Sequence, residues 1–271
     1  MPIHPTAIVD PRAEIDASAD VGPYVVIDGP VRIGARTRVM AGAYLTAATT
    51  IGADNVIHPH AVLGHEPQDL NYRGAPTELR IGDRNVIREH AEIHRGTPAG
   101  TWTEIGDDNF LMSRAHVAHN CRLGSRTILA TGATLGGHAV IEDLAFVSGN
   151  CVVHQYARVG RLAIMQGLSR TSRDVPPYAI MDATHEVRGL NRIGLRRAGF
   201  DVERIRALAA AFRILFRVRT NLREAALRVE AELRSEDVDY LLAFIRASKR
   251  GVAQGPRRAP AEDDDEADAE S

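Results

Sequence analysis

Residues 105–165 read IGDDNF LMSRAH VAHNCR LGSRTI LATGAT LGGHAV IEDLAF VSGNCV VHQYAR VGRLAI M when they are written in blocks of six. Every complete block opens on a large aliphatic residue, and its fifth residue is usually small. The same period runs back to Ile3, with breaks near residues 69, 75 and 99. A period of six matches neither a helical turn nor simple strand alternation, whereas hexapeptide repeats are typical of parallel β-helices. The chain is therefore predicted to be mainly β, with one hexad on each flat side of a coil.

Three hexads would complete one triangular coil, so that positions three hexads apart stack on neighbouring coils. The large residue of each hexad fills the interior, and the small one lets the chain bend. Glycine at the second position of many hexads is expected to support tight corners, and Asn55, Asn85 and Asn109 are expected to take positive φ. Cys121 and Cys151 are five hexads apart, which is not a whole number of coils, so we expect buried free thiols.

The composition is that of a soluble chain. Its 271 residues include 33 Lys and Arg against 35 Asp and Glu, a formal net charge of −2, and nothing indicates nucleic-acid binding. The apolar runs are much shorter than the roughly 20 residues that cross a bilayer, so no stable membrane insertion is expected. No basic or apolar leader precedes the repeat. We therefore expect a cytoplasmic protein.

The organisation of the chain changes after the segment VPPY at residues 175–178. Residues 188 to about 250 have helical spacing, which predicts three or four short helices, with start and stop signals at Gly199, Asp201, Asn221 and Ser235. The C-terminal segment 251–271 contains seven acidic and two basic side chains, which predicts a disordered tail. The expected domains are a β-helix over 1–185, a helical domain over 186–250 and an acidic tail over 251–271.

Histidine is the residue most informative about chemistry. Four of the eleven histidines fall where the three-hexad period is uninterrupted: His116, His119, His138 and His154. Asn120 and His138 are one coil apart, and His154 is one residue short of two coils after His119, so these side chains should cluster near one edge. A lone surface histidine is more often simply solvated. The convergence of several favours a proton-transfer site, because imidazole titrates near neutral pH.

Two segments depart from the hexads. Residues 64–80 read GHEPQDLNYRGAPTELR and replace interior aliphatic residues with Pro, Gly and polar side chains. A long excursion from a rigid scaffold is commonly functional. The second departure, around Pro98 to Glu104, is shorter, and we interpret it as a tolerated insertion.

Six segments in fixed order carry a more specific pattern: GHEPQDL at 64–70, IGDRN at 81–85, IHRGT at 93–97, AHVAH at 115–119, HQ at 154–155 and DVPPY at 174–178. Together they resemble the bacterial acyl-ACP:UDP-N-acetylglucosamine O-acyltransferases, which begin lipid A synthesis. The resemblance covers nearly all of residues 1–250. It implies a left-handed β-helix, a homotrimer with sites in the clefts between subunits, and no metal or other cofactor.

The resemblance also implies a mechanism. His119 matches a general base that removes the proton from the 3-hydroxyl of UDP-N-acetylglucosamine, which attacks the thioester of a 3-hydroxyacyl acyl carrier protein. His138 matches a position near the reacting carbonyl, where a donor stabilises the oxyanion. Gly167 matches the position that sets acyl length and suggests room for a longer chain. Other matched contacts are Gln68 and Asp69 for the sugar or hydroxyacyl group, His116, His154 and Gln155 along the cleft, and Asn191 and Arg197 for the nucleotide.

Two residues depart from the family pattern. Asn120 follows His119 where the family usually has aspartate, and Asn71 stands where lysine is expected, with Arg73 two residues later as its replacement. These departures favour, as alternatives, an acyltransferase for a 3-amino sugar nucleotide or a diverged sugar-nucleotide-binding protein without turnover. A γ-type carbonic anhydrase with zinc between subunits is a third alternative, against which the His116/His119 spacing and the helical end both argue.

Overall fold

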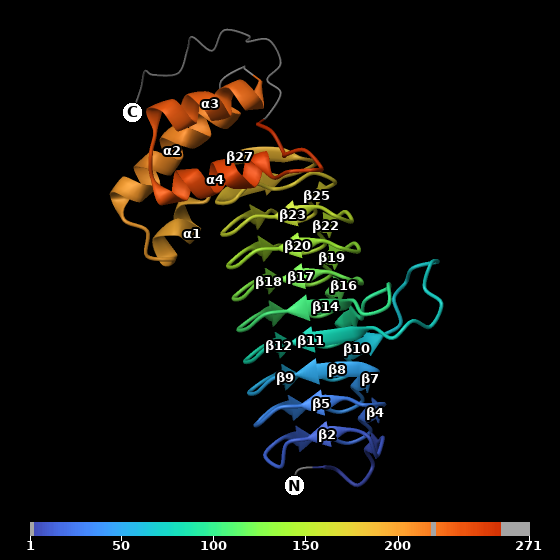
Figure 1. The fold of residues 1–271 in the computed structure, drawn as a ribbon. Coiled ribbons are helices and arrows are strands. Elements are labelled where there is room, and N and C mark those ends of the chain that lie inside the picture. Colours follow the sequence, from blue (N-terminus) through green and yellow to red (C-terminus); the bar gives the residue numbers. More distant parts are fainter. Residues whose placement is uncertain (1–2, 218–220, 256–271) are drawn as a thin grey trace.

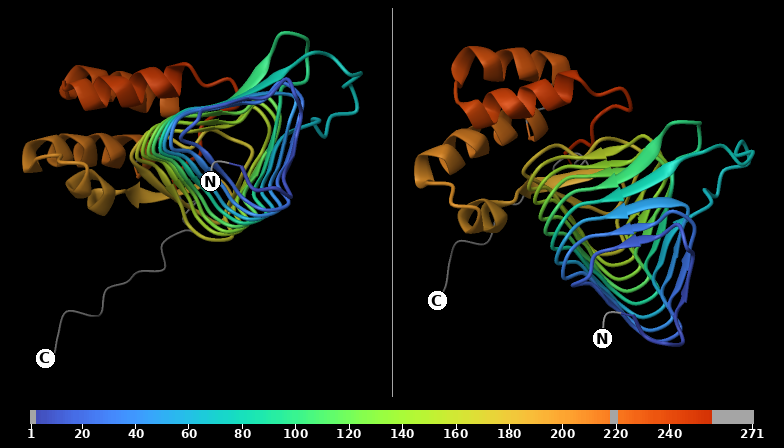
Figure 2. Two further views of the ribbon diagram at one scale, coloured as in Figure 1. Left: turned by 90° about the horizontal axis from the view of Figure 1, so that it is seen from below. Right: turned by 60° about the horizontal axis from the view of Figure 1, so that its bottom comes forward.

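The computed structural model describes residues 3–217 and 221–255. Stacked coils form a column with helices packed at one end (Figure 1), and the column has a triangular cross-section when it is seen from below (Figure 2). Within the described residues, three sheets form the three sides, with nine, eight and ten strands. All strand pairs are parallel except β26 with β27. The predicted parallel β-helix is confirmed.

The strands of the three sheets alternate along the chain. The nine-stranded sheet contains β1 (Ile8–Val9), β4 (Val26–Asp28), β7 (Tyr44–Thr46), β10 (Val62–His65), β13 (Glu92–His94), β16 (His116–Val117), β19 (Thr134–Leu135), β22 (Val152–Val153) and β25 (Arg170–Thr171). The eight-stranded sheet contains β2 (Glu14–Ile15), β5 (Arg32–Ile33), β8 (Ala48–Ile51), β11 (Glu78–Ile81), β14 (Trp102–Ile105), β17 (Arg122–Leu123), β20 (Val140–Ile141) and β23 (Arg158–Val159). The ten-stranded sheet contains β3 (Asp20–Val21), β6 (Arg38–Val39), β9 (Val56–Ile57), β12 (Val86–Ile87), β15 (Phe110–Leu111), β18 (Ile128–Leu129), β21 (Phe146–Val147), β24 (Ile164–Met165), β26 (Ala179–Asp182) and β27 (Glu186–Leu190).

The large aliphatic residues of the hexads fill the interior, as predicted. Val117 pairs with Leu135, and Leu135 with Val153, on three successive coils, and all three are fully buried. Burying such a side chain is worth about 1.5–3 kcal/mol. Repetition of this stacking from coil to coil stabilises the β-helix. It also fixes which positions of each hexad point outward.

Of the second-position glycines, Gly64 has positive φ, 79°, but most do not, so their role differs from the expected one. Gly34 and Gly106 do not have positive φ. A Cβ on Gly34 would lie 2.6 Å from the carbonyl carbon of Gly52, and one on Gly106 would lie 2.6 Å from the carbonyl oxygen of Gly124. Glycine is required at these positions because successive coils approach each other too closely for any side chain.

The expectation for the three asparagines is also wrong. Positive φ falls on the residue before each of them, as at Arg84, whose φ is 56°. Asn55, Asn85 and Asn109 point inward and are buried. The backbone N–H of Asn85 donates to Asn55 Oδ1 at 2.9 Å, and the N–H of Asn109 donates to Asn85 Oδ1 at 2.9 Å. The asparagines therefore form a ladder that satisfies backbone donors inside the corner.

Four helices follow the coils within the described residues: α1 (Arg192–Arg197), α2 (Val202–Phe216), α3 (Leu222–Glu232) and α4 (Glu236–Arg246). The predicted signals at Asp201, Asn221 and Ser235 are the N-caps of α2, α3 and α4. Residues 188–190, expected to be helical, belong instead to β27. The described part of the chain contains no helix long and apolar enough to span a membrane.

The first five residues of the predicted tail are ordered. Val252 forms a parallel bridge with Asp174, and Gln254 forms one with Glu186. Ala253 between them is fully buried. Residues 251–255 are therefore ordered against the coil, and the rest of the predicted tail, 256–271, lies outside the described residues.

Candidate active site

A cleft of about 620 Å³ lies along β16, β19 and β22, beside the loop of residues 64–80. The loop projects from the column near β10 and β14 (Figure 1). The predicted site residues that line this cleft are Gln68, Asp69, Asn71, His116, His119, His138, His154 and Gln155. The structure therefore brings together side chains from the loop and from three successive coils.

His119 lies at the corner after β16 with 12% of its side chain exposed. Gly137 occupies the equivalent position one coil further on. A Cβ on Gly137 would lie 2.4 Å from Nε2 of His119, so only glycine leaves room for this imidazole. Gly137 was not among the predicted site residues, although its place three hexads after His119 is visible in the sequence.

Asn120 orients the ring of His119. Its Oδ1 lies 3.0 Å from Nδ1 of His119 and also accepts from the backbone N–H of Thr97 at 3.0 Å. Its amide Nδ2 donates to Oγ1 of Thr101 at 2.9 Å, while the Thr101 hydroxyl donates to the carbonyl of Pro98 at 2.7 Å. Oδ1 of Asn120 is therefore the atom turned toward the ring. Nδ1 of His119 carries the proton, and Nε2 keeps its lone pair for the cleft.

The second departure from the hexads, 98–104, supports this arrangement. It contains Thr101, which fixes the Asn120 amide, and Thr103, whose Oγ1 accepts from the backbone N–H of Asn120 at 2.8 Å. Our interpretation of this segment as a merely tolerated insertion is wrong. It holds the residue that orients His119.

His138 is presented by the corner one coil above Asn120. Asn120, His138 and Tyr156 have φ of 58°, 61° and 64°, so the left-handed corner turns all three outward in one column. The His138 ring stacks on Tyr156 with centroids 4.5 Å apart and meets His119 edge to face at 5.3 Å. Burial lowers the pKa of His138, and the nearby His119 lowers it further. A neutral His138 can donate one N–H to an oxygen in the cleft.

Asp69 supplies a negative charge on the cleft side of His119. Its Oδ1 accepts from the backbone N–H of Asn71 at 2.9 Å, and this bond lowers the pKa of the Asp69 carboxyl. Its Oδ2 lies 3.8 Å from Nε2 of His119. Asp69 thus provides charge that Asn120 lacks, and it can stabilise a protonated imidazole.

Comparison with known proteins decides between the alternatives. Residues 103–137 match the bacterial transferase hexapeptide model, and residues 174–253 match the second domain of UDP-N-acetylglucosamine O-acyltransferase. A relative from Syntrophobacter fumaroxidans named acyl-[acyl-carrier-protein]–UDP-N-acetylglucosamine O-acyltransferase is 46% identical over 257 residues, covering 93% of this chain and 99% of that protein. This chain belongs to the acyl-[acyl-carrier-protein]–UDP-N-acetylglucosamine O-acyltransferase family. It is thus an O-acyltransferase of the lipid A pathway, and the carbonic anhydrase and non-catalytic alternatives lose their support.

Other members of the family are similar to this chain in sequence and in structure. A relative of the same name from Thermodesulfovibrio yellowstonii is 43% identical over 93% of this chain and 99% of its own. The crystal structure of the Francisella novicida UDP-N-acetylglucosamine acyltransferase superposes with a TM-score of 0.89 at 33% identity, covering 94% of this chain and 95% of that one. The shared architecture is the left-handed β-helix that the resemblance implied.

Four of the predicted substrate-binding residues do not line the cleft of a single chain. The guanidinium of Arg73 donates to the carbonyls of Leu70 and Tyr72 in its own loop. Asn191 caps α1, accepting from the N–H of Gly194 and donating to the carbonyl of Leu162, both at 2.9 Å. Gly167 and Arg197 are exposed and line no part of the cleft.

Arg95 anchors the family's excursion loop and was missed in the sequence analysis. Its guanidinium, 11% exposed, donates to the carbonyl of Gly64 at 2.8 Å and to the hydroxyl of Tyr72 at 2.8 Å. These bonds tie both limbs of the loop to β13. Arg95 therefore sets the position from which Asp69 enters the cleft.

The two thiols do not offer a nucleophile. Cys121 and Cys151 are buried and free, as expected. Burial raises the pKa of Cys121 to about 12 and also raises that of Cys151. Because the thiolate is the nucleophilic form, neither cysteine is suited to carry an acyl group.

Proposed function

We propose that this acyltransferase moves a 3-hydroxyacyl group from acyl carrier protein directly to the 3-position of UDP-N-acetylglucosamine, with His119 as the general base. One observation carries the proposal. The proton on Nδ1 of His119 is held by Oδ1 of Asn120 at 3.0 Å, which leaves Nε2 free at the cleft beside Asp69.

The proposed reaction has two steps. Nε2 of His119 takes the proton from the 3-hydroxyl as the oxygen attacks the thioester carbonyl, and His138 donates an N–H to the developing oxyanion. The carbon–sulfur bond then breaks, and the protonated His119 returns its proton to the departing thiolate of the carrier. Asp69, at 3.8 Å, stabilises the positive imidazole between the steps.

The same proposal assigns substrate contacts and assembly. Gln68, Asp69 and Asn71 hold the sugar from the loop, while His116, His154 and Gln155 line the path of the acyl chain. The positions of Gly167, Asn191 and Arg197 outside one chain's cleft support a homotrimer in which a neighbouring subunit completes each site. The absence of a side chain at Gly167 leaves room for a longer acyl chain, and the carrier and nucleotide substrates place the enzyme in the cytoplasm.

A 3-amino sugar nucleotide is a second candidate acceptor. Asn120 gives His119 a hydrogen-bond acceptor without a negative charge, so it stabilises a protonated ring less than a carboxylate at the same position would. An amine attacks a thioester with less help from a base than a hydroxyl does. The Asn120 contact therefore favours testing both acceptors.

Product analysis tests the proposal. The purified protein is incubated with UDP-N-acetylglucosamine or its 3-amino analogue and a ladder of 3-hydroxyacyl carriers, and products are identified by mass spectrometry. We expect an ester at the 3-position of UDP-N-acetylglucosamine, and His119→Gln should reduce turnover by about 10²- to 10⁴-fold. An unchanged rate in that variant would contradict the role of His119, and product only from the hydroxyl acceptor would exclude the amine.

A further inference from the structure

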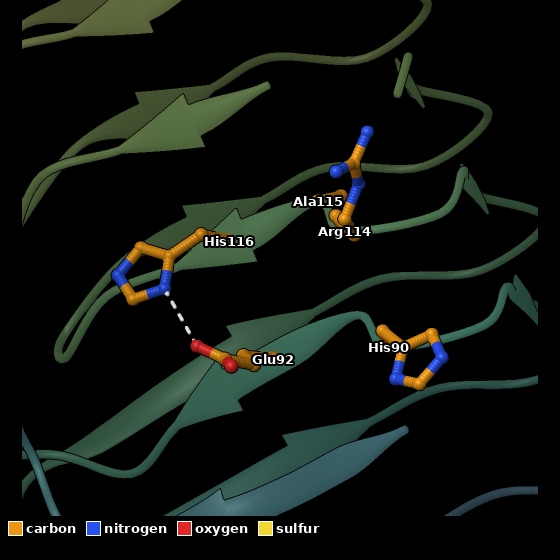
Figure 3. A pocket seen from close by; sticks show the side chains of 5 residues that line it. All are labelled: His90, Glu92, Arg114, Ala115 and His116. Carbon is orange, nitrogen blue, oxygen red and sulfur yellow. Dashed lines mark hydrogen bonds and ion pairs between the residues drawn. The ribbon is translucent and has the colours of Figure 1, made fainter. Parts of the chain in front are cut away.

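A second cluster of side chains lies on the same sheet, next to the cleft. Glu92 and His94 come from β13 and His116 from β16, and Glu92 pairs in register with His116. One ligand atom from each of the three residues lies within 4.8 Å of the others. Figure 3 shows Glu92 and His116 projecting from adjacent strands, with Nδ1 of His116 3.4 Å from Oε2 of Glu92.

His94 has one ring nitrogen without a partner. The residue is 6% exposed, and its Nδ1 lies 2.6 Å from the carbonyl oxygen of Glu66. A carbonyl can only accept, so Nδ1 carries the proton and Nε2 carries the lone pair. Nε2 is buried and has no hydrogen-bond partner among the described residues. A buried nitrogen left in this state is unfavourable and therefore requires an explanation.

The hydrogen bonding of His94 is that of a metal-ligating histidine. A ligating histidine almost always donates its second N–H to a carbonyl or carboxylate, which fixes the tautomer and aims the lone pair. The Glu66 carbonyl plays this part for His94.

We propose that Glu92, His94 and His116 bind a divalent cation of the zinc class. Two imidazoles and one carboxylate are a recurrent zinc ligand set that leaves a fourth position open. Bond lengths of about 2.0–2.2 Å require the three ligand atoms to draw closer than they are now. Glu92 is half exposed, so its side chain can move toward the buried His94.

Two of the three proposed ligands, Glu92 and His116, also line a cavity. A cavity of about 460 Å³ is lined by His90, Glu92, Arg114, Ala115 and His116 (Figure 3). Water can occupy the fourth position from this side, and the arginine favours an anionic ligand there. Because Glu66 belongs to the excursion loop, the ion would tie the base of that loop to β13 and β16.

Metal binding by the whole protein tests the proposal. The full chain is stripped with chelator, and zinc affinity and stoichiometry are measured by titration calorimetry, with cobalt absorption as a probe of tetrahedral geometry. We expect one zinc per chain. His94→Gln and Glu92→Gln should each weaken binding by about 100-fold, whereas His90→Gln, which lines the same cavity without belonging to the cluster, should bind as the parent does.

Two results would overturn the proposal. One is a parent protein that binds zinc no better than Glu92→Gln, a variant whose exposed position leaves the coil folded. The other is loss of zinc binding in His119→Gln with retention in His94→Gln, because the ion would then belong to the catalytic cleft. The measurement needs no acyl transfer, so its outcome is independent of the proposed reaction.

Discussion

Replacing Asn120 with aspartate would place a negative charge next to the ring nitrogen of His119 that faces away from the cleft. The present Asn120 oxygen is 3.0 Å from that nitrogen, so the new carboxylate would lie about 4 Å from the centre of the imidazole charge. Two unit charges at that distance interact by about 4 kcal/mol at an effective dielectric constant near 20. The variant also requires the Thr101 hydroxyl to turn from the Pro98 carbonyl, because a carboxylate cannot donate to it.

The net effect is smaller than the Coulomb value. Asp69 already places a charge 3.8 Å from the other ring nitrogen, and both side chains are partly exposed to solvent. A favourable interaction with the protonated ring remains. Since catalysis needs the unprotonated ring, the acid limb of the kcat/KM profile should move to higher pH. Above the limb, the stronger base should raise kcat/KM for the hydroxyl acceptor about 3- to 10-fold.

The assay is the pH dependence of kcat/KM for both acceptors with one acyl carrier. Asn150→Asp is the matched control, because Asn150 also holds a left-handed corner, with φ of 53°, but does not line the cleft. The control should leave the profile unchanged. A limb that stays in place in Asn120→Asp, or moves to lower pH, would refute the claim that Asn120 sets the basicity of His119.

Three further outcomes are expected. Gly137→Ala, whose new methyl would lie 2.4 Å from Nε2 of His119, should lower kcat at least about 10²-fold while thermal unfolding shows a folded coil. The pKa of His138 in NMR should be lower than that of an exposed histidine because burial and His119 both lower it, and His119→Gln should move the midpoint upward. Asn85→Ala should reduce the free energy of unfolding in urea by about 2–3 kcal/mol, because it leaves the buried Asn109 N–H unpaired and removes the second of two bonds to Asn55 Oδ1, whereas the exposed Asn71→Ala should change it by less than about 0.5 kcal/mol.

The period of six was sufficient to predict the coil and the convergence of the histidines. Stacking of every third hexad follows from the repeat, so His119, His138 and His154 could be placed along one edge before the structure was known. Because the two excursions interrupt the period, the sequence did not predict the cluster of Glu92, His94 and His116. Glu92 and His116 are four hexads apart yet pair directly, because the second excursion lengthens that coil by one hexad. The loop length can be counted from the sequence, but the pairing across it cannot.

Local conformation at the corners was predicted less well. The periodicity gives the phase of each residue but not which of two neighbours takes positive φ, so Asn85 was assigned the conformation of Arg84. Composition also misjudged residues 251–255, because the backbone bridges to Asp174 and Glu186 add to the burial of the two apolar side chains there, Val252 and Ala253. Contacts of the main chain leave little trace in residue type.

The left-handed corners also define where this enzyme could be made more heat-resistant. Among the described residues, 20 non-glycine positions have φ between 49° and 67°, a conformation that costs an L-residue about 1–2 kcal/mol. At Asn120, His138 and Tyr156 this strained backbone positions side chains in or next to the cleft. Tyr24 and Arg126 do not line the cleft, so replacing either with glycine or asparagine would relieve the backbone strain without changing the site. Thermal tolerance and turnover can therefore be engineered at different corners of the β-helix.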